Sequence, residues 1–447
     1  MPWEIARGAG PRRTGSCRRQ WLRTPLRQKF AQILSIIVKP LYRNAWVPMS
    51  CSCTYRRAGC VYDCGNSQAI CTVRVRSMSE ISKHVTAPFD IGHLKLKNRY
   101  ALAPMTRVSA TEEGCATHAM ARYYERFAKG GFGLIITEGN YTDRSFSQGY
   151  RFQPGITDDE QAQAWRATTE ALHRHGSAVI AQIMHAGALS QANRFVNEAI
   201  GPSAIRPKGE QMAFYYGEGS YRVPRALSDK DIADVIGGFV RATQLAIGTA
   251  GFDGVEIHGA NGYLLDQFLT DYSNQRTDQW GGDVEQRLRL TFEVIAEVKK
   301  VAGQAPVGVR LSQGKVNDFE HKWAGGERDA EIIFGALADA GVDYIHVTEH
   351  EACQPAFPQG EASLVKLARR YAPGVALIAN GGLHEPDKAQ QVLQDGADII
   401  AVGKGALANP DLPRLLLEGG AVRDFDPSIL GPIANIKDRE LAFNMAS

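Results

Sequence analysis

The chain has 447 residues, of which 44% are hydrophobic and 22% are charged, and its formal net charge is +3. This composition is ordinary for a globular enzyme, and the length allows one large domain or two of medium size. No apolar run reaches the roughly 18 residues that a membrane-spanning helix needs, so a membrane is not an expected partner.

The first 77 residues differ in composition from the rest. They contain 14 Lys and Arg against two acids, Glu4 and Asp63, together with six of the eight cysteines. The segment has the charge of an organellar transit peptide, but a basic arm for nucleic acid or membrane surfaces and a functionless upstream start are alternatives. We expect residues 1–77 to be a disordered extension and residues 78–447 to form the folded domain. The cysteine pairs within residues 1–77 are not followed by a second pair at zinc-binding spacing, so no metal site is predicted.

The remaining residues are mildly acidic, with 37 Lys and Arg against 46 Asp and Glu. Nucleic acid is therefore not an expected partner, because duplex binding usually needs a basic face. Only Cys115 and Cys353 occur in this part of the chain. Such sparse cysteine favours a reducing compartment, the cytoplasm, or an organelle if the extension is a transit peptide.

Short β-branched runs alternate with longer helical patterns from residue 78 onward, which is typical of parallel strands joined by crossover helices. Eight such units favour a closed (β/α)8 TIM barrel, which typically spans about 250 residues plus insertions, over an open sheet, the alternative. Helices are predicted over 229–250 and 284–301, the first with a capping start at Ser228 and Asp231. The predicted strands are 100–103, 134–137, 178–183, 254–258, 307–311, 344–348, 376–380 and 399–402.

A long interval, residues 184–228, separates the third strand from its helix. It is rich in Gly, Pro, Tyr and Arg. Because loops of this length are commonly functional, we predict a capping segment over the mouth of the barrel.

Polar residues follow most of the predicted strands, at the ends that meet on one face of a barrel and usually form its active site. His258, Asn261 and Tyr263 follow the fourth strand. His and Asn can each donate a hydrogen bond to one oxygen, and Tyr has a transferable proton. The three suit a carbonyl substrate that develops enolate-like charge and is then protonated at carbon.

Glycines follow the seventh and eighth strands, at Gly381, Gly382, Gly403 and Gly405. Glycine lets backbone N–H groups approach a phosphate closely, and Lys404 adds a cation. A phosphate site after the last two strands is common in such barrels, so the sequence predicts a phosphorylated cofactor.

Together these features resemble the old yellow enzyme family, FMN-dependent ene-reductases built on an eight-stranded barrel. The resemblance spans residues 88–417 and rests on the order and spacing of several motifs. They are APMTR at 103–107, GGFGLIITEG at 130–139, EIHGANGY at 256–263, SNQRTDQWGG at 273–282 and GKGALANP at 403–410.

The resemblance implies an FMN cofactor, NADPH or NADH as reductant, and a small-molecule activated alkene as substrate. Arg310 would stabilise negative charge at the N1/O2 edge of the isoalloxazine. Lys404 stands where the family more often has Arg, which replaces a bidentate fork by a point charge. The implied partners are Pro104, Met105, Thr106, Gly139 and Gln182 for the ring, and Gly381, Gly382, Gly403 and Lys404 for the phosphate.

The resemblance also implies that His258 and Asn261 hold the carbonyl oxygen of the substrate and that Tyr263 protonates its α-carbon. His185 is expected to be a core or supporting residue. The alternatives are an FMN barrel dehydrogenase of dienoyl-CoA or amine type, disfavoured because those larger enzymes add an iron-sulfur cysteine cluster, and a non-catalytic flavin-binding protein. The oligomeric state is open, with a symmetric homodimer as the commonest arrangement.

Overall fold

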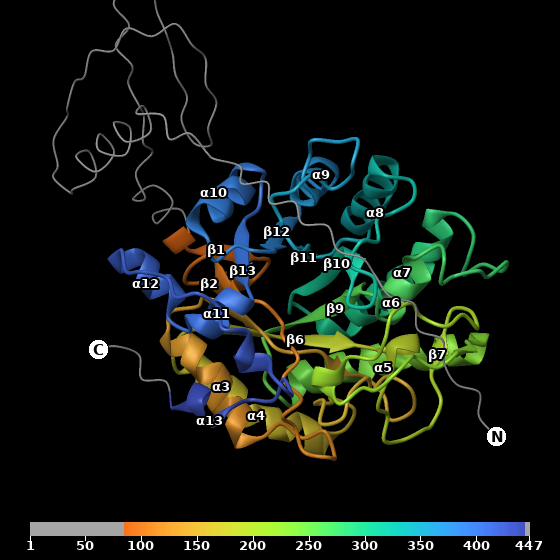
Figure 1. Cartoon of the computed structure of the whole chain (residues 1–447), viewed down its shortest axis with the longest axis horizontal. Helices are drawn as coiled ribbons and strands as arrows, with labels where there is room; N and C mark the ends of the chain where they lie inside the picture. Colours follow the sequence, from red (N-terminus) through yellow and green to blue (C-terminus); the bar gives the residue numbers. More distant parts are fainter. Residues whose placement is uncertain (1–84, 443–447) are drawn as a thin grey trace, which may run out of the picture. The chain divides into compact units, whose positions relative to one another are not determined.

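Eight parallel strands form a closed ring at the centre of the structure, a computed structural model that describes residues 85–442 (Figure 1). The ring closes where β4 pairs with β6 as well as with β3. The predicted closed barrel is therefore confirmed over the open sheet. The ring strands are β3 (Tyr100–Leu102), β4 (Leu134–Ile136), β6 (Ala178–Met184), β9 (Gly254–Asn261), β10 (Val307–Lys315), β11 (Tyr344–Thr348), β12 (Ala376–Asn380) and β13 (Ile399–Val402).

The interpretations of residues 1–77, including the domain boundary after residue 77, lie outside the described residues and stay predictions.

Helices surround the ring (Figure 1). The predicted start of α5 is confirmed: the Ser228 hydroxyl accepts from the N–H of Asp231, and the Asp231 carboxylate accepts from the N–H of Ser228. Such reciprocal capping satisfies two N–H groups that the helix itself cannot. The helices are α3 (His118–Lys129), α4 (Asp159–His173), α5 (Asp229–Gly248), α6 (Leu264–Leu269), α7 (Val284–Ala302), α8 (Glu327–Asp339), α9 (Leu364–Tyr371), α10 (Pro386–Gln394), α11 (Lys404–Ala408), α12 (Leu412–Glu418) and α13 (Asp438–Leu441).

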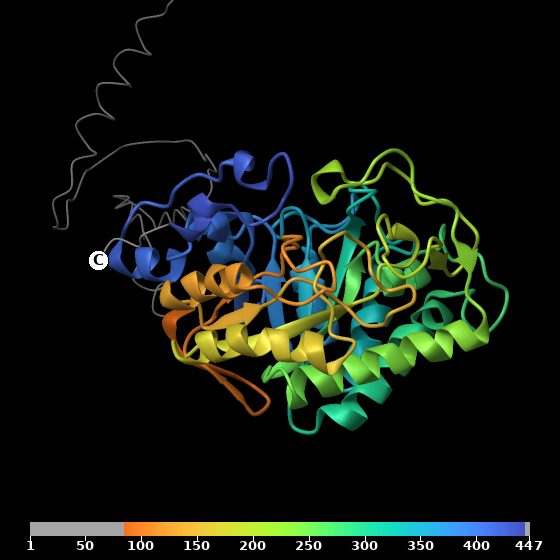
Figure 2. The same cartoon turned by 90° about the horizontal axis from the view of Figure 1, so that it is seen from below.

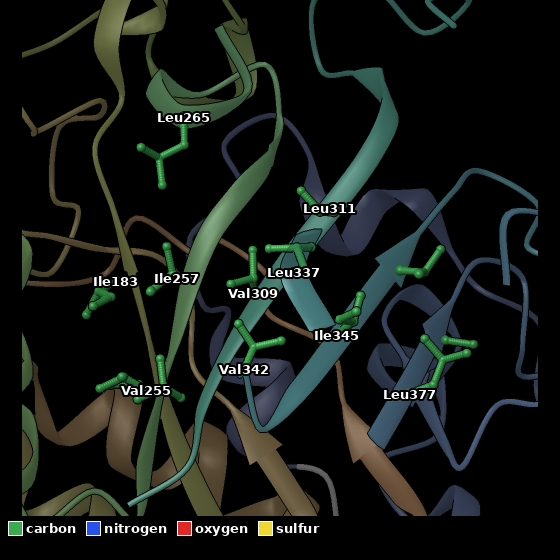
Figure 3. Close-up of a cluster of buried hydrophobic side chains, with 14 of the residues drawn as sticks. Ile183, Val255, Ile257, Leu265, Val309, Leu311, Leu337, Val342, Ile345 and Leu377 are labelled. Atoms are coloured by element: carbon green, nitrogen blue, oxygen red, sulfur yellow. The ribbon is translucent and has the colours of Figure 1, made fainter. Parts of the chain in front are cut away.

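Successive side chains of each strand face opposite sides of the barrel wall. Val309 and Leu311 of β10 face outward and pack in one apolar cluster with Leu337 of α8 (Figure 3). Arg310, between them, therefore faces the barrel interior. A second buried cluster fills the lower interior with inward side chains such as Ile136 and Ile378.

A hairpin that the sequence analysis missed, β1 (Phe89–Ile91) with β2 (Leu94–Leu96), contributes Ile91 and Leu96 to this lower cluster. Its three-residue strands are too short for a clear periodic pattern. The hairpin lies at the end of the barrel opposite the segment of residues 184–228 (Figure 2).

Three ring strands extend further than predicted because their ends gain extra backbone partners. β6 continues to Met184 alongside a short strand, β5 (Asn140–Tyr141). β9 and β10 continue until Asn261 pairs with Lys315, after a register shift beyond Leu311. Asn261 is consequently the last residue of its strand rather than a residue beyond it, which corrects the predicted end at 258.

The predicted cap contains the short strands β7 (Ile200–Gly201) and β8 (Arg225–Ala226), and the 3-10 turns η1 (Gly187–Leu189) and η2 (Ala213–Tyr215). Met212, Tyr215 and Tyr221 of the cap pack in one cluster with Tyr263. The cap therefore covers the predicted site, on the same side of the barrel as the C-terminal segment, which includes η3 (Pro427–Leu430) (Figure 2).

Arg107 anchors the C-terminal segment. Its guanidinium is fully buried and forms a bidentate ion pair with Glu440, at 2.9 and 2.6 Å, while its Nε donates to the carbonyl of Ala434. The N–H of Ala434 in turn donates to the carbonyl of Phe214 in the cap. These bonds join the cap and the C-terminal segment above the barrel.

Within residues 85–442, no helix is both long and apolar enough to cross a membrane. The same residues contain no group of three or more His, Cys, Asp or Glu side chains placed to hold a metal ion. Cys115 and Cys353 are both free thiols.

The outward apolar layer should dominate stability. Leu337→Ala is expected to lower the free energy of unfolding by about 2–5 kcal/mol, because Leu337 is fully buried and its loss leaves a cavity. Leu417→Ala, at a side chain that is 55% exposed, is the matched control and should change it by less than about 0.5 kcal/mol. Guanidinium titration of both variants measures this, and similar losses would contradict the assignment of the core.

Candidate active site

Arg310 is a buried cation at the upper end of the barrel interior. In the strand register it lies between His258 of β9 and His346 of β11. Its Nη2 donates to Thr348 Oγ1 and to Asn380 Oδ1, both at 3.1 Å. Its Nε has no hydrogen-bond partner among the described residues. A buried guanidinium with an unpaired N–H favours an electron-rich or anionic ligand beside it.

Glu256 lies deeper in the barrel and orients two neighbours. Its carboxylate accepts from Gln182 Nε2 at 2.9 Å and contacts His346 Nδ1 at 2.8 Å. Burial alone would raise the pKa of Glu256, but His346, Arg310 and the hydrogen bond from Gln182 hold it below its usual value. One N–H of the Gln182 amide is thus engaged by Glu256, which orients the amide and leaves its carbonyl oxygen and its second N–H for a ligand.

Gly139, which follows β4, lies against this glutamine. A Cβ at Gly139 would come within 2.1 Å of Met184 Sδ and 3.3 Å of Gln182 Oε1. A side chain here would displace Met184, and the backbone of Gly139 is close to the glutamine that faces the site. The carbonyl of Gly139 accepts from Gln153 Nε2 at 2.8 Å, which holds the segment in place.

The segment after β3 brings the predicted ring-binding residues under the cap. Pro104 is buried, Met105 and Thr106 are half-buried, and the Thr106 carbonyl accepts from the Tyr215 hydroxyl at 3.3 Å. A Cβ at Gly403 would lie 3.5 Å from Met105 Sδ. The segments after β3 and β13 are therefore adjacent.

The glycine-containing segments that follow β12 and β13 are also in contact with each other. Gly381 and Gly382 have φ values of 140° and 71°, which side chains rarely adopt. A Cβ at Gly405 would come within 2.2 Å of the His384 side chain, so the segments after β12 and β13 are in contact. Lys404 is exposed at the first turn of α11, where backbone N–H groups have no intrahelical partner.

His258 is 3% exposed and electrically neutral. Burial, together with the positive charge of Arg310 and the proximity of His346, lowers the pKa of His258 well below 6.5. Its Nδ1 accepts the N–H of Ala260 at 3.4 Å, which assigns the single ring proton to Nε2. The imidazole is therefore a neutral donor through Nε2.

Asn261 adopts a left-handed backbone conformation, with φ of 63°. Its N–H donates to Ser312 Oγ at 2.8 Å, and its carbonyl accepts the N–H of Val316 at 3.1 Å. These bonds fix the backbone from β10 and engage neither atom of the side-chain amide. The half-buried side chain borders a cleft of about 400 Å³ that also includes Thr348.

Tyr263 stands next to His258, with ring centroids 4.9 Å apart. Its hydroxyl lies 2.5 Å from that of Tyr150, and both side chains are buried. Burial raises the pKa of Tyr263 to about 12, although the hydrogen bond with Tyr150 and the charge of Arg310 act to lower it. Tyr263 is therefore protonated across the physiological range.

Tyr150 is a site residue that the sequence analysis missed. It lies in the loop after β5, 113 positions from Tyr263, and no local motif marks it. Thr348 and Asn380, which hold Arg310, were also missed, although both end predicted strands and could have been found by the same rule that found Arg310. His185, in contrast, is a supporting residue as expected: Nδ1 accepts from the N–H of Gly187, and Nε2 lies 3.5 Å from Asp143.

The donors and acceptors at this face fit FMN. Arg310 presents an unpaired buried N–H, which suits the electron-rich edge of the ring system. Gln182 presents an oriented carbonyl, which suits a ring N–H. Gly382 and Gly403 are partly exposed and have no side chain to cover their backbone, and Lys404 follows Gly403 directly, an arrangement that suits a phosphate.

Comparison with known proteins agrees with this chemistry. Residues 84–421 match the model of the NADH:flavin oxidoreductase / NADH oxidase family. A probable flavin mononucleotide-dependent alkene reductase of Leishmania infantum is 34% identical over 366 residues, covering 78% of this chain and 96% of the relative. The 12-oxophytodienoate reductase 1 of Oryza sativa subsp. japonica is 36% identical, covering 73% of this chain and 84% of the relative.

Solved structures give the same result. An old yellow enzyme homologue from Zymomonas mobilis superposes with a TM-score of 0.73 at 30% identity, covering 81% of this chain and 99% of that one. Morphinone reductase in complex with tetrahydroNAD superposes with a TM-score of 0.68 at 31% identity, covering 77% and 93%. The chain therefore belongs to the NADH:flavin oxidoreductase family, the family of old yellow enzyme.

Proposed function

We propose that His258, Asn261 and Tyr263 perform the alkene half of an FMN-dependent reaction in which NAD(P)H provides the reducing equivalents and the C=C bond of an α,β-unsaturated carbonyl compound is reduced. The conclusion rests on one observation: a neutral Nε2–H donor and a protonated phenol stand side by side above a buried cation. When bound, FMN supplies hydride chemistry between the nicotinamide and the alkene.

His258 and Asn261 act on the carbonyl oxygen of the substrate. His258 donates from Nε2 and Asn261 from its side-chain amide, and both bonds strengthen as enolate charge develops on that oxygen. Because His258 is neutral, it stabilises the charge as a hydrogen-bond donor without giving up its proton. Donors fixed before the reaction need no reorganisation during it, which is the source of their catalytic effect.

Tyr263 donates its hydroxyl proton to the α-carbon, and Tyr150 supports this transfer. For Tyr263 to donate to substrate, its oxygen must accept the hydrogen bond from Tyr150. The same bond then stabilises the phenolate that proton transfer leaves, and the nearby charge of Arg310 acts in the same direction. Tyr150 is thus a positioning residue for the proton donor.

The remaining residues hold the cofactor in this proposal. The segment from Pro104 to Thr106, with Gly139 and Gln182, would hold the isoalloxazine, and Arg310 would pair with its electron-rich edge. Gly381, Gly382, Gly403 and Lys404 bind the phosphate. The dienoyl-CoA or amine dehydrogenase and the non-catalytic flavin protein are less favoured, because the relatives named above include an alkene reductase and two further reductases.

The free thiols Cys115 and Cys353 support a reducing compartment such as the cytoplasm. A symmetric homodimer is proposed on general grounds only.

An anaerobic titration tests the function. The purified full-length protein is expected to show a flavin absorption band that NADPH or NADH bleaches and that cyclohexenone restores, with cyclohexanone as the product. A protein that cannot be reconstituted with FMN would overturn the cofactor assignment. Bleaching without recovery on any activated alkene would move the function to another acceptor.

Tyr263→Phe should slow the step that cyclohexenone triggers by about 10²-fold or more, because a general acid typically contributes 10²–10⁴-fold. Bleaching by NADPH should keep its rate, since that step needs no proton from Tyr263. Stopped-flow absorbance of the two half-reactions measures both rates.

Tyr371→Phe is the control for this change. Its hydroxyl bonds to Glu327 at 2.9 Å on the exposed face of α9, so both half-reactions should match the wild type. An unchanged second half-reaction in Tyr263→Phe would assign the proton to another donor.

The rate of the cyclohexenone step should not change with pH between roughly pH 6 and pH 9. A histidine with its ordinary pKa of about 6.5, or a tyrosine with its ordinary pKa of about 10, would make the rate vary near the ends of this range. The lowered pKa of His258 keeps it neutral throughout this range, and the pKa of about 12 keeps the Tyr263 proton in place. A pH series by stopped flow measures the profile. An inflection near neutrality that disappears in His258→Asn would show that His258 is charged at lower pH.

A further inference from the structure

A buried ion pair lies beside the site and has no part in the mechanism described so far. Lys315 Nζ lies 2.8 Å from Asp266 Oδ1, with side-chain exposures of only 2% and 0%. Burying two charges costs several kcal/mol per ion before they attract each other, so such a pair is weak evidence for a contribution to stability. Its position suggests another role.

The pair joins the two segments that form the Asn261 turn. Lys315, at the end of β10, is the backbone partner of Asn261 at the end of β9. Asp266, in the first turn of α6, accepts the N–H of Gly262 through Oδ2 at 2.6 Å. Through Asp266, the ion pair therefore connects Lys315, the strand partner of Asn261, to Gly262, the residue that follows Asn261 in the chain.

The turn has an unusual backbone and is packed closely against the end of β10. Asn261 and Gly262 have φ values of 63° and 86° in succession. Apart from glycine, asparagine is among the residues that tolerate this region best, so the sequence Asn-Gly suits the turn and few other pairs would. A Cβ at Gly262 would come within 2.7 Å of Asn317 Oδ1 and 3.2 Å of Lys315 Cβ, so the turn is packed closely against the end of β10.

We propose that Lys315 and Asp266 are positioning residues for the carbonyl-binding group: their ion pair fixes the left-handed turn, and the turn aims the Asn261 amide at the substrate oxygen. This inference rests on the proposed function of Asn261. Two groups hold Asp266 Oδ1 while Oδ2 accepts the N–H of Gly262: Lys315 Nζ at 2.8 Å and, more distantly, the Thr270 hydroxyl at 3.3 Å. Lys315 is the charged partner and the closer one. Without Lys315, the buried carboxylate has to move toward solvent or another donor, and the turn moves with it.

Binding of cyclohexanone to the oxidised, FMN-containing protein tests this without turnover. The titration follows the change in the flavin absorption spectrum. Lys315→Met is expected to raise the dissociation constant about 10-fold, which is comparable to the loss of one hydrogen bond to the ligand. With cyclohexenone, KM should rise while bleaching by NADPH retains its rate constant at saturation.

A double-mutant cycle separates positioning from general damage. Asn261→Ala should weaken cyclohexanone binding by itself, and Lys315→Met should add nothing in the Asn261→Ala background if it acts through Asn261. Lys208→Met is the matched control, because Lys208 pairs at 2.7 Å with Asp318 in the loop just after β10 but is 57% exposed. It should bind cyclohexanone as the wild type does.

A further variant covers the case in which Lys315→Met does not fold. Asp266→Leu with Lys315→Met removes both charges, and apolar replacement of a buried ion pair is often neutral for stability. This double variant should retain FMN and should bind cyclohexanone more weakly than the wild type does.

The inference would be overturned if folded Lys315→Met, or the double variant, bound cyclohexanone as the wild type does. It would also be overturned if Lys315→Met weakened binding equally in the wild-type and Asn261→Ala backgrounds. Either result would leave the proposed function standing. If Asn261→Ala itself has no effect, the role of Asn261 in the proposed function fails, and this inference fails with it.

Discussion

In a closed ring of parallel strands, a strand cannot slide by one residue without turning its inward side chains outward. Every ring strand here has partners on both edges, so its register is fixed from both sides. Val309 and Leu311 must face the helices, and Arg310 must then face the interior. A charged group reaches the centre of an apolar domain in this way, and the rest of the site is arranged around it.

The buried charge of Arg310 imposes a second condition, since an uncompensated guanidinium in this position would be costly. Thr348 and Asn380 satisfy one of its nitrogens, and the Glu256 carboxylate compensates part of its charge. Together with burial, the same cation keeps His258 neutral. One electrostatic centre therefore prepares the site for an electron-rich ring and sets the protonation of the substrate-binding histidine.

The cap and the C-terminal segment control the polarity of the site from above. Tyr215 and Tyr221 of the cap pack with Tyr150 and Tyr263 below it, and burial raises the pKa of all four. A proton donor in such an apolar setting keeps its proton until substrate charge draws it away. The buried pair of Arg107 and Glu440 fastens this cover, so its ordering depends on a residue of the APMTR motif.

The sequence by itself determined the barrel, its eight strands and the polar residues near their carboxyl ends, although β6, β9 and β10 end later than predicted. These features are local: strand periodicity repeats within a few residues, and the spacing of His258, Asn261 and Tyr263 lies within one motif. Tertiary structure alone decided the contacts between distant segments, such as Tyr150 with Tyr263 and Lys315 with Asp266. It also decided the neutral state of His258, because burial and the field of Arg310 arise only when the strands close into a ring.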